Sequence, residues 1–271
     1  MQSTESIARR TVLRGGIVGG AGLLAGCLGG ETVTSDETRV FDVAGTGTVA
    51  DGASKLTLYS QQGDVRVRPT DGSAIRIDLH RSTRSGRKAL TAAKLDVTRR
   101  GDTLELRGVR ETRNWLTDGP QVSMDMDVFV PTTGSVAVEV ARVETKLGDI
   151  SIDGVRGAPE LITDMGDVRV ATIDGFSRID GDGDVTVDLR TLRDGVTSLI
   201  VDSGDVTLRV DPALSCDLEV NVEHGDIVVE GLTFTHVVDG DRTFAGRLGP
   251  GGRRLTVTCE HGDVYLYSIA E

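Results

Sequence analysis

The sequence predicts an all-β protein whose main body is a β-solenoid, a coil of short stacked strands. Glycine-aspartate followed by Val or Ile occurs seven times, beginning at Gly63, Gly148, Gly166, Gly183, Gly204, Gly225 and Gly262. The second and fourth residues after each glycine are always apolar, which is the alternation of a strand that buries one face. Between Gly148 and Gly225 the pairs recur every 17 to 21 residues, about one solenoid turn.

The composition favours a single unit of this kind. The chain has 271 residues, 35 glycines and only 3% aromatic residues. That balance suits a solenoid filled with Val, Ile and Leu better than a sandwich packed around large rings. We therefore expect one domain over residues 38–271, with regular repeats from about residue 132.

Residues 1–26 are expected to be a twin-arginine lipoprotein signal. Arg9 and Arg10 lie in the run A-R-R-T-V-L-R, which resembles a twin-arginine motif and precedes a weakly apolar, glycine-rich segment. The sequence L-A-G-C ending at Cys27 resembles a lipobox, in which cleavage before the cysteine leaves it free for lipid attachment. The alternative of a transmembrane anchor is disfavoured, because a spanning helix needs about 20 apolar residues. Residues 27–37, rich in Gly, Thr, Ser and acids, are expected to be a flexible tether.

The first part of the domain alternates less regularly than the rest. A helical turn or two is expected over 87–95, and a loop over 114–120 carries the only tryptophan, Trp115. Strands are expected at 55–58, 75–79, 95–97, 104–106 and 122–130.

Each regular repeat is expected to be a strand, a corner at Gly-Asp, and a second strand. Glycine suits the corner because a tight turn often requires positive φ, and aspartate accepts hydrogen bonds from the next backbone amides. Stacked corners would align one column of carboxylates, formed by Asp149, Asp167, Asp184, Asp205, Asp226 and Asp263.

The longer interval from Gly225 to Gly262 is expected to hold an insertion. Segments 232–238 and 242–248 flank the sequence D-G-D, which predicts a β-hairpin. A hairpin near the end would shield the final coil, since an open solenoid end invites edge pairing.

At this point the chain resembles the adhesin-like domain of unknown function found in envelope proteins of bacteria and archaea. The resemblance rests on D-V-F-V-P at 127–131, on the G-D-[VI] coils from Gly148 to Gly262, and on the terminal G-D-V-Y-L. It covers roughly residues 55–268. It implies a right-handed parallel β-helix or β-roll on a cell surface, without an assigned reaction.

The charge of the chain limits its partners. The formal net charge is -12, which makes nucleic acid and acidic lipid surfaces unsuitable. Aspartate outnumbers glutamate and arginine outnumbers lysine, as in proteins of salt-adapted archaea, where surface carboxylates keep proteins soluble. Most acidic side chains are therefore expected to be solvated.

One acidic segment invites a calcium or an enzymatic interpretation. Asp180, Asp182 and Asp184 in D-G-D-G-D mimic the start of a calcium loop, but the sixth position is Val instead of Gly and the twelfth is Thr instead of Glu. With Arg178 they are also the least implausible site for an enzyme acting on envelope polysaccharide. Two acids at a suitable separation are inevitable among 42, however, so we favour a solvated acidic face.

The same segment departs from the repeat. The fifth and third residues before the glycine are apolar or small in the other tight repeats, whereas before Gly183 they are Arg178 and Asp180. Such a departure marks either a functional site or a one-residue slip. Because a shift of one residue moves every side chain of a strand to the opposite face, a slip would turn Ile179 inward and leave both charged side chains in water. We favour the slip.

His224 and His261 occupy equivalent corners, each after Glu and before Gly-Asp. If the hairpin loops out, their rings would stack at about 4.8 Å, the strand spacing. With Asp226 and Asp263 they suggest a zinc site as an alternative. Stacked repeats create such ladders without selection for a metal, so no metal or cofactor is assigned.

Cys216 and Cys259 would be permitted a disulfide in an exported protein. Alignment of 218–226 with 255–263 places Cys259 where the earlier repeat has Val222, which favours a small buried thiol over the disulfide.

Tyr265 and Tyr267 are expected on the strand face opposite Val264 and Leu266. They would either cover the last coil, which we favour, or form a small contact surface.

The sequence thus predicts a lipid-anchored structural or binding module, adhesin-like and non-catalytic, on the extracellular face of the cell membrane. The membrane would be reached through a lipid on Cys27, and the other expected partner is an envelope protein or polysaccharide. No catalytic residue is assigned, and G-x-S-x-G, phosphate-loop and C-x-x-C motifs are absent from the sequence. The alternatives are a polysaccharide lyase or glycoside hydrolase, and a calcium- or zinc-stabilised surface protein.

Overall fold

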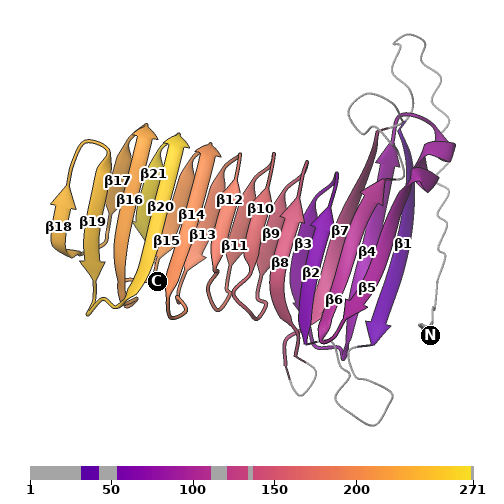
Figure 1. Ribbon diagram of the computed structural model, residues 1–271, viewed down its shortest axis with the longest axis horizontal. Helices are drawn as coiled ribbons and strands as arrows, with labels where there is room; N and C mark the ends of the chain where they lie inside the picture. The colour runs from indigo at the N-terminus through magenta and orange to yellow at the C-terminus, as the bar shows by residue number, and fades with distance from the viewer. Residues whose placement is uncertain (1–31, 43–53, 111–120, 134–136, 270–271) are drawn as a thin grey trace.

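The computed structural model describes residues 32–42, 54–110, 121–133 and 137–269. These residues form two β-sheets that face each other along an elongated molecule (Figure 1). Sheet A has ten strands and sheet B has eleven. The predicted all-β class is confirmed, and the only helix in the described part is a 3-10 helix, η1 (Arg87–Ala92), within the predicted 87–95. None of the described helical residues makes a segment long and apolar enough to cross a membrane.

Each regular coil gives one strand to each sheet, and neighbouring coils pair in parallel. Sheet A contains, in spatial order, β1 (Val33–Asp42), β4 (Ala74–Thr83), β7 (Val122–Pro131), β3 (Val65–Thr70), β9 (Ile150–Asp153), β11 (Val168–Ala171), β13 (Val185–Leu189), β15 (Val206–Val210), β21 (Val264–Ser268) and β17 (Ile227–Glu230). Sheet B contains β18 (Thr235–Asp239), β19 (Thr243–Leu248), β16 (Cys216–His224), β20 (Arg253–His261), β14 (Val196–Ser203), β12 (Arg178–Gly181), β10 (Glu160–Thr163), β8 (Glu139–Thr145), β2 (Lys55–Ser60), β6 (Thr103–Arg110) and β5 (Ala93–Arg100).

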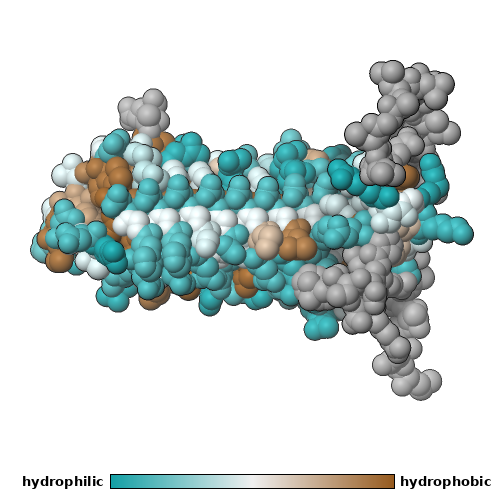
Figure 2. Space-filling view, turned by 90° about the horizontal axis from the view of Figure 1, so that it is seen from above, coloured by the Kyte–Doolittle hydropathy of each residue, from teal (hydrophilic) through white to brown (hydrophobic). Residues whose placement is uncertain are grey.

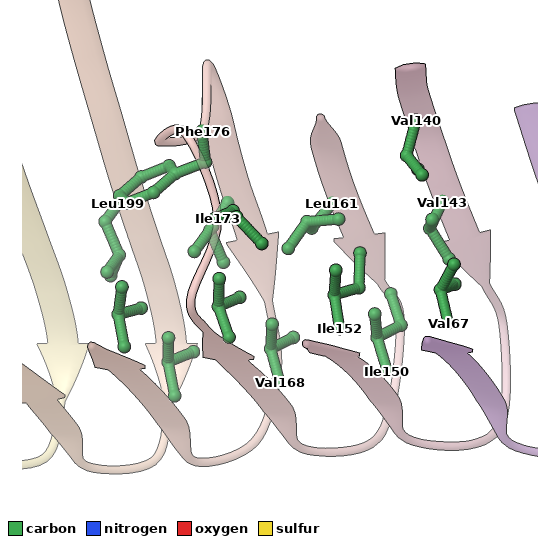
Figure 3. Close-up of a cluster of buried hydrophobic side chains, with 14 of the residues drawn as sticks. Val67, Val140, Val143, Ile150, Ile152, Leu161, Val168, Ile173, Phe176 and Leu199 are labelled. Carbon is green, nitrogen blue, oxygen red and sulfur yellow. The ribbon is translucent and has the colours of Figure 1, made fainter. Parts of the chain in front are cut away.

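Aliphatic side chains fill the space between the sheets. Ile150 and Ile152, the second and fourth residues after Gly148, are at most 1% exposed and lie near Leu161 of sheet B (Figure 3). Full burial of one such side chain contributes about 1.5–3 kcal/mol. The same inward pair is buried in every coil except that of β17, where Ile227 and Val229 are half-buried because no strand of sheet A lies beyond them.

The coil around Gly63 stacks directly on the coil around Gly148, although 85 residues separate their corners. The intervening chain extends the stack at one end. There β4 pairs antiparallel with β1 and β7, and β5 pairs antiparallel with β6. This antiparallel part explains why the first half of the sequence lacks the regular repeat.

Strand β1 corrects the predicted tether. It begins at Val33 and pairs with β4 along all ten residues, to Asp42 opposite Ala74. Residues 33–37 therefore belong to sheet A, and the predicted tether of 27–37 extends too far. The strand was missed because an edge strand is largely solvated, so its sequence carries polar residues in place of a clear apolar alternation.

The last coil in the sequence is not the last coil in space. Strand β20 lies between β14 and β16, and β21 lies between β15 and β17. The chain therefore skips one position, builds the end coil β16–β17, and returns to fill the gap with β20–β21. The expectation that the Gly262 coil ends the solenoid is wrong.

The predicted hairpin is present as β18 and β19, which pair antiparallel. Strand β19 continues sheet B beyond β16, so the hairpin covers the Gly225 coil. Phe244 packs edge-on against Phe234 there, with ring centroids 5.1 Å apart.

Candidate functional site

Glycine is required at each corner for two separate reasons. All seven repeat glycines have φ between 123° and 149°, a conformation that other residues rarely adopt. In addition, a Cβ at Gly166 would lie 2.3 Å from the carbonyl oxygen of Gly148 in the adjacent coil. The corner glycines therefore allow the backbones of neighbouring coils to approach closely.

The aspartates after these glycines form a hydrogen-bonded ladder. The Oδ1 atom of Asp149 accepts the backbone N–H of Asp167 at 2.9 Å, and Asp167 accepts in the same way from Asp184 at 3.0 Å. Asp184 accepts from Asp205 at 2.9 Å. The sequence correctly predicts that these carboxylates accept backbone amides, but the donors come from the next coil instead of the same corner.

The ladder is longer than predicted and differs in order. Asp64 Oδ1 accepts the N–H of Asp149, and Asp125 Oδ1 accepts that of Asp64, both at 3.1 Å. Figure 2 looks down on this edge, where a straight pale row runs along the long axis between hydrophilic rows. The complete order is Asp125, Asp64, Asp149, Asp167, Asp184, Asp205, Asp263 and Asp226.

A groove of about 250 Å³ lies beside the ladder, on the outer face of sheet A. It crosses β3, β9, β11 and β13. Arg66 and Arg169 project from β3 and β11, and the shorter Ser151 lies between them on β9, which leaves the hollow. Four ladder residues, Asp64, Asp149, Asp167 and Asp184, border it.

This groove was not predicted from the sequence. Its side chains occupy the third position after each glycine, on the strand face opposite the core. Comparing that position between repeats, which reads Arg, Ser, Arg and Thr from Gly63 to Gly183, would have revealed a short side chain between two long ones. The adjacency of the Gly63 and Gly148 coils, however, was not readable from the sequence.

The slip in β12 is confirmed. Ile179, and not Arg178, lies opposite Leu199 of β14 and Leu161 of β10, and Ile179 is fully buried. Arg178 and Asp180 project outward and form an ion pair with each other.

The four residues of the hypothetical polysaccharide enzyme do not meet in one cleft. Arg178 and Asp180 lie on the outer face of sheet B, whereas Asp184 borders the groove on sheet A. Asp182 lies at the corner between the two sheets, where its carbonyl accepts the N–H of Gly166. Paired carboxylates flanking one substrate bond are therefore not formed by this set.

The predicted stacking of His224 and His261 is confirmed. Their ring centroids lie 4.7 Å apart with an interplanar angle of 4°. The Oε1 atom of Glu260 lies 3.9 Å from Nδ1 of His261. Within the described ranges no group of three or more His, Cys, Asp or Glu side chains is arranged to hold a metal ion.

Cys216 and Cys259 are free and buried, in agreement with the favoured interpretation. Cys259 lies opposite Val222, as the repeat alignment predicts, and its thiol approaches the carbonyl oxygens of Gly204 and Gly262 at 3.5 Å. Burial, together with the charges of nearby aspartates, raises the pKa of Cys259 to about 11. Burial likewise raises the pKa of Cys216 to about 11.

Tyr265 and Tyr267 lie on the outer face of sheet A, opposite the buried Val264 and Leu266. Their rings are nearly parallel, with centroids 6.0 Å apart. The Tyr265 hydroxyl donates to Asp263 Oδ2 at 3.0 Å, and this carboxylate raises the pKa of the phenol. Because β21 lies inside the stack, the pair does not cover a terminal coil.

Several predicted features lie outside the described residues. They are the signal residues Arg9 and Arg10, the lipidation residue Cys27, and the loop with Trp115.

A solved structure shares the fold. The structure of a "putative cell adhesion protein" from Clostridium sporogenes matches with a TM-score of 0.50 and 11% identity, over 88% of this chain and all of that one. A "putative adhesin" from Bacteroides fragilis matches with a TM-score of 0.31 and 12% identity, over 87% of this chain and 97% of that one. A search among curated proteins found no match.

The family resemblance seen in the sequence is confirmed by a family model. The model described as Toastrack DUF4097 matches residues 131–267, about half of the chain, which contain the regular coils and the hairpin. The chain therefore belongs to the Toastrack DUF4097 family.

Proposed function

We propose that the protein is a lipid-anchored, non-catalytic binding module on the outer face of the cell membrane. One observation carries the binding role: the stacked coils present the same polar groups at regular intervals along a rigid edge, through the ladder from Asp125 to Asp226. Such a surface suits contacts with an extended partner. The name of the Clostridium sporogenes structure agrees with this role.

The absence of catalysis is proposed because the acids considered for it diverge. Arg178 and Asp180 neutralise each other on sheet B, and Asp184 already accepts a backbone hydrogen bond within the ladder. These contacts engage Arg178, Asp180 and Asp184, while Asp182 lies at the corner between the sheets, so the set forms no pair of acids that flank one substrate bond.

The anchor is proposed from Arg9, Arg10 and Cys27, together with the position of β1. Only residues 28–32 separate Cys27 from Val33, and five residues span at most about 18 Å. A lipid on Cys27 would therefore hold the β1, β4 and β7 end of the stack near the membrane and leave the hairpin end free to reach outward. We also propose the right-handed coil implied by the family resemblance and by the usual sense of parallel crossovers; an experimental structure would test it.

Fractionation of the source cells tests the anchor. The wild-type protein should be in the membrane fraction and accessible to protease on intact cells, whereas Cys27→Ala should be released. Replacement of Arg9 and Arg10 by Lys should keep the protein inside the cell. Membrane retention of Cys27→Ala would contradict lipid anchoring.

Crosslinking on intact cells at their native salinity tests the binding role. A partner enriched with the wild-type protein and lost with Cys27→Ala, identified by mass spectrometry, is the expected result. Diffuse capture without enrichment would argue against a binding module and for a structural coat component.

A further inference from the structure

We infer that the groove on sheet A binds a neutral glycan chain laid across β3, β9, β11 and β13. This inference rests on the proposed function and adds the chemical class of the partner. It is drawn from the polar groups of the groove, their signs of charge and their spacing.

The groove collects polar groups without partners among the described residues. Asp149, Asp167 and Asp184 use only Oδ1 in the ladder, which leaves three Oδ2 acceptors along one border. The Arg169 guanidinium, which has up to five N–H donors, is exposed to solvent and forms no ion pair or hydrogen bond with any described residue. The Ser151 hydroxyl between the two arginines is likewise unused.

These groups favour a neutral ligand over a charged one. A phosphate or carboxylate would meet three aspartates at the border, and Arg66 is already bound to Asp64 Oδ2 at 2.6 Å. A metal ion is disfavoured because, within the described residues, no three acidic side chains are arranged to hold one. A cationic group could contact the aspartates but would leave the N–H donors of Arg169 unused, so a ligand whose groups both donate and accept hydrogen bonds fits best.

An apolar peptide also fits poorly. Ile150 and Val168 line the groove only with their backbones, because their side chains are at most 1% exposed. A sugar hydroxyl, in contrast, both donates and accepts: it can donate to the aspartate oxygens and accept from Arg169. Neutral sugars are therefore the class that satisfies both kinds of group at once.

The spacing of the groups favours a chain over a single sugar. Four parallel strands place equivalent groups about 4.8 Å apart, over a total of about 14 Å. The same row of sheet A continues through Thr186 and Thr207 to Tyr265, whose ring offers a further surface for a sugar. A longer glycan would lie along this row, parallel to the solenoid axis.

Titration calorimetry with the folded protein tests the inference. The probes are neutral oligosaccharides of glucose, mannose, galactose and N-acetylglucosamine, an oligogalacturonate as the anionic probe, and calcium chloride. At least one neutral oligosaccharide should bind at millimolar concentration or below. Asp167→Asn should weaken it about tenfold, the effect of losing one good hydrogen bond, and Arg169→Ala should do the same. Asn retains the carbonyl that accepts the Asp184 N–H, so the ladder stays closed.

Matched control variants keep the test specific. Asp205→Asn makes the same change in the same ladder outside the groove, and Arg178→Ala removes an exposed arginine from sheet B. Both should bind within about twofold of the wild type, since distant sites act independently. Equal binding by all four variants would overturn the inference, because the glycan would then bind elsewhere.

Three other outcomes would also overturn it: binding of oligogalacturonate alone, binding of calcium alone, and no binding of any neutral oligosaccharide. The proposed function is judged separately by the anchor and crosslinking experiments. If a protein partner is enriched and no glycan binds, the proposed binding role is supported and only the inference of a glycan ligand is overturned.

Discussion

At the corners, two adjacent residues act on neighbouring coils in different ways. Glycine permits the close approach of the neighbouring backbone, and aspartate accepts that neighbour's amide hydrogen. The threonines beneath the corners add a third link: Thr163 donates to the Gly148 carbonyl at 3.3 Å, and Thr145 donates to that of Gly63 at 3.4 Å. The same few contacts repeat along the whole edge.

Comparing Gly166→Ala with Gly195→Ala separates the two reasons for a corner glycine, positive φ and close approach of the adjacent coil. Its Cβ would meet the Gly148 carbonyl at 2.3 Å, in addition to the strain of φ 144°, so the free energy of unfolding should fall by roughly 3–5 kcal/mol. Gly195→Ala is the control, because Gly195 has φ 110° but open space around its Cβ position. It should lose only about 1 kcal/mol in guanidinium unfolding. Equal losses would show that the close approach between coils is unimportant.

The ladder hydrogen bond is tested at Asp205, whose Oδ1 accepts the Asp263 N–H at 2.9 Å. Asp205→Ala should lower the free energy of unfolding by about 1 kcal/mol, because it removes the acceptor. Asp205→Asn, which keeps a carbonyl oxygen there, should lose clearly less. If the two variants unfold at the same denaturant concentration, the ladder does not contribute to stability.

Cys259 gives a pH dependence of known sign. Its pKa is about 11 in the folded chain against an ordinary value of 9.0, so the folded state keeps the thiol proton that the unfolded state releases. Stability from this group is therefore complete below pH 9 and decreases between pH 9 and 11. Cys259→Val, which copies Val222 of the neighbouring coil, should flatten that decrease in guanidinium unfolding curves. An unchanged slope in the variant would contradict the assignment.

At the scale of elements, most strands of the regular coils were predicted from the alternation of apolar and polar residues. Two strands, β12 and β18, depart from the common pattern. β12 shifts by one residue because Ile179 is the only apolar side chain near its centre, and burying it outweighs keeping the common register. β18 is exposed along all five residues, with Val238 at 65%, because it lies two strands beyond β16 in sheet B, whereas sheet A already ends at β17.

The hairpin is predicted to stabilise the end coil mainly through β19. Phe244→Ala should lower the free energy of unfolding by roughly 3 kcal/mol, because Phe244 is 6% exposed and packs on Phe234. Val238→Ser on the exposed strand should change it by less than about 0.5 kcal/mol. Thermal unfolding of both variants checks this, and an equal effect would mean that the hairpin acts as a whole and not through its buried face.

For the whole molecule, the order of the coils in space differs from their order in the sequence. The end coil β16–β17 contacts the rest of the solenoid through β20–β21, which follow it in the sequence. The final strands therefore join two parts of the stack that would otherwise have no shared strand pairing.

Truncation after residue 249 tests this arrangement. Removal of β20 and β21 should expose not only their own neighbours but the complete end coil, residues 216–230, to fast hydrogen exchange. Strands β8 to β13 should stay protected, because their partners remain. Continued protection of 216–230 would show that this coil can pair directly with β14 and β15.

The burial of Cys259 and the stacking of the histidines were predicted by aligning two repeats, the stacking on the condition that the hairpin loops out and makes their coils neighbours. The sequence by itself determined what depends on residues close in the chain: the all-β class, the inward alternation, the glycine corners and the hairpin. Each follows from a local pattern that only one backbone conformation and one buried face can satisfy. Only the tertiary structure decided which coils are neighbours, and thereby the place of β20–β21, the pairing of β1, and the groove between Arg66 and Arg169. Those features depend on contacts between residues far apart in the sequence, such as Asp205 and Asp263, which are separated by 58 positions. Local alternation is equally compatible with several stacking orders and therefore does not predict such contacts.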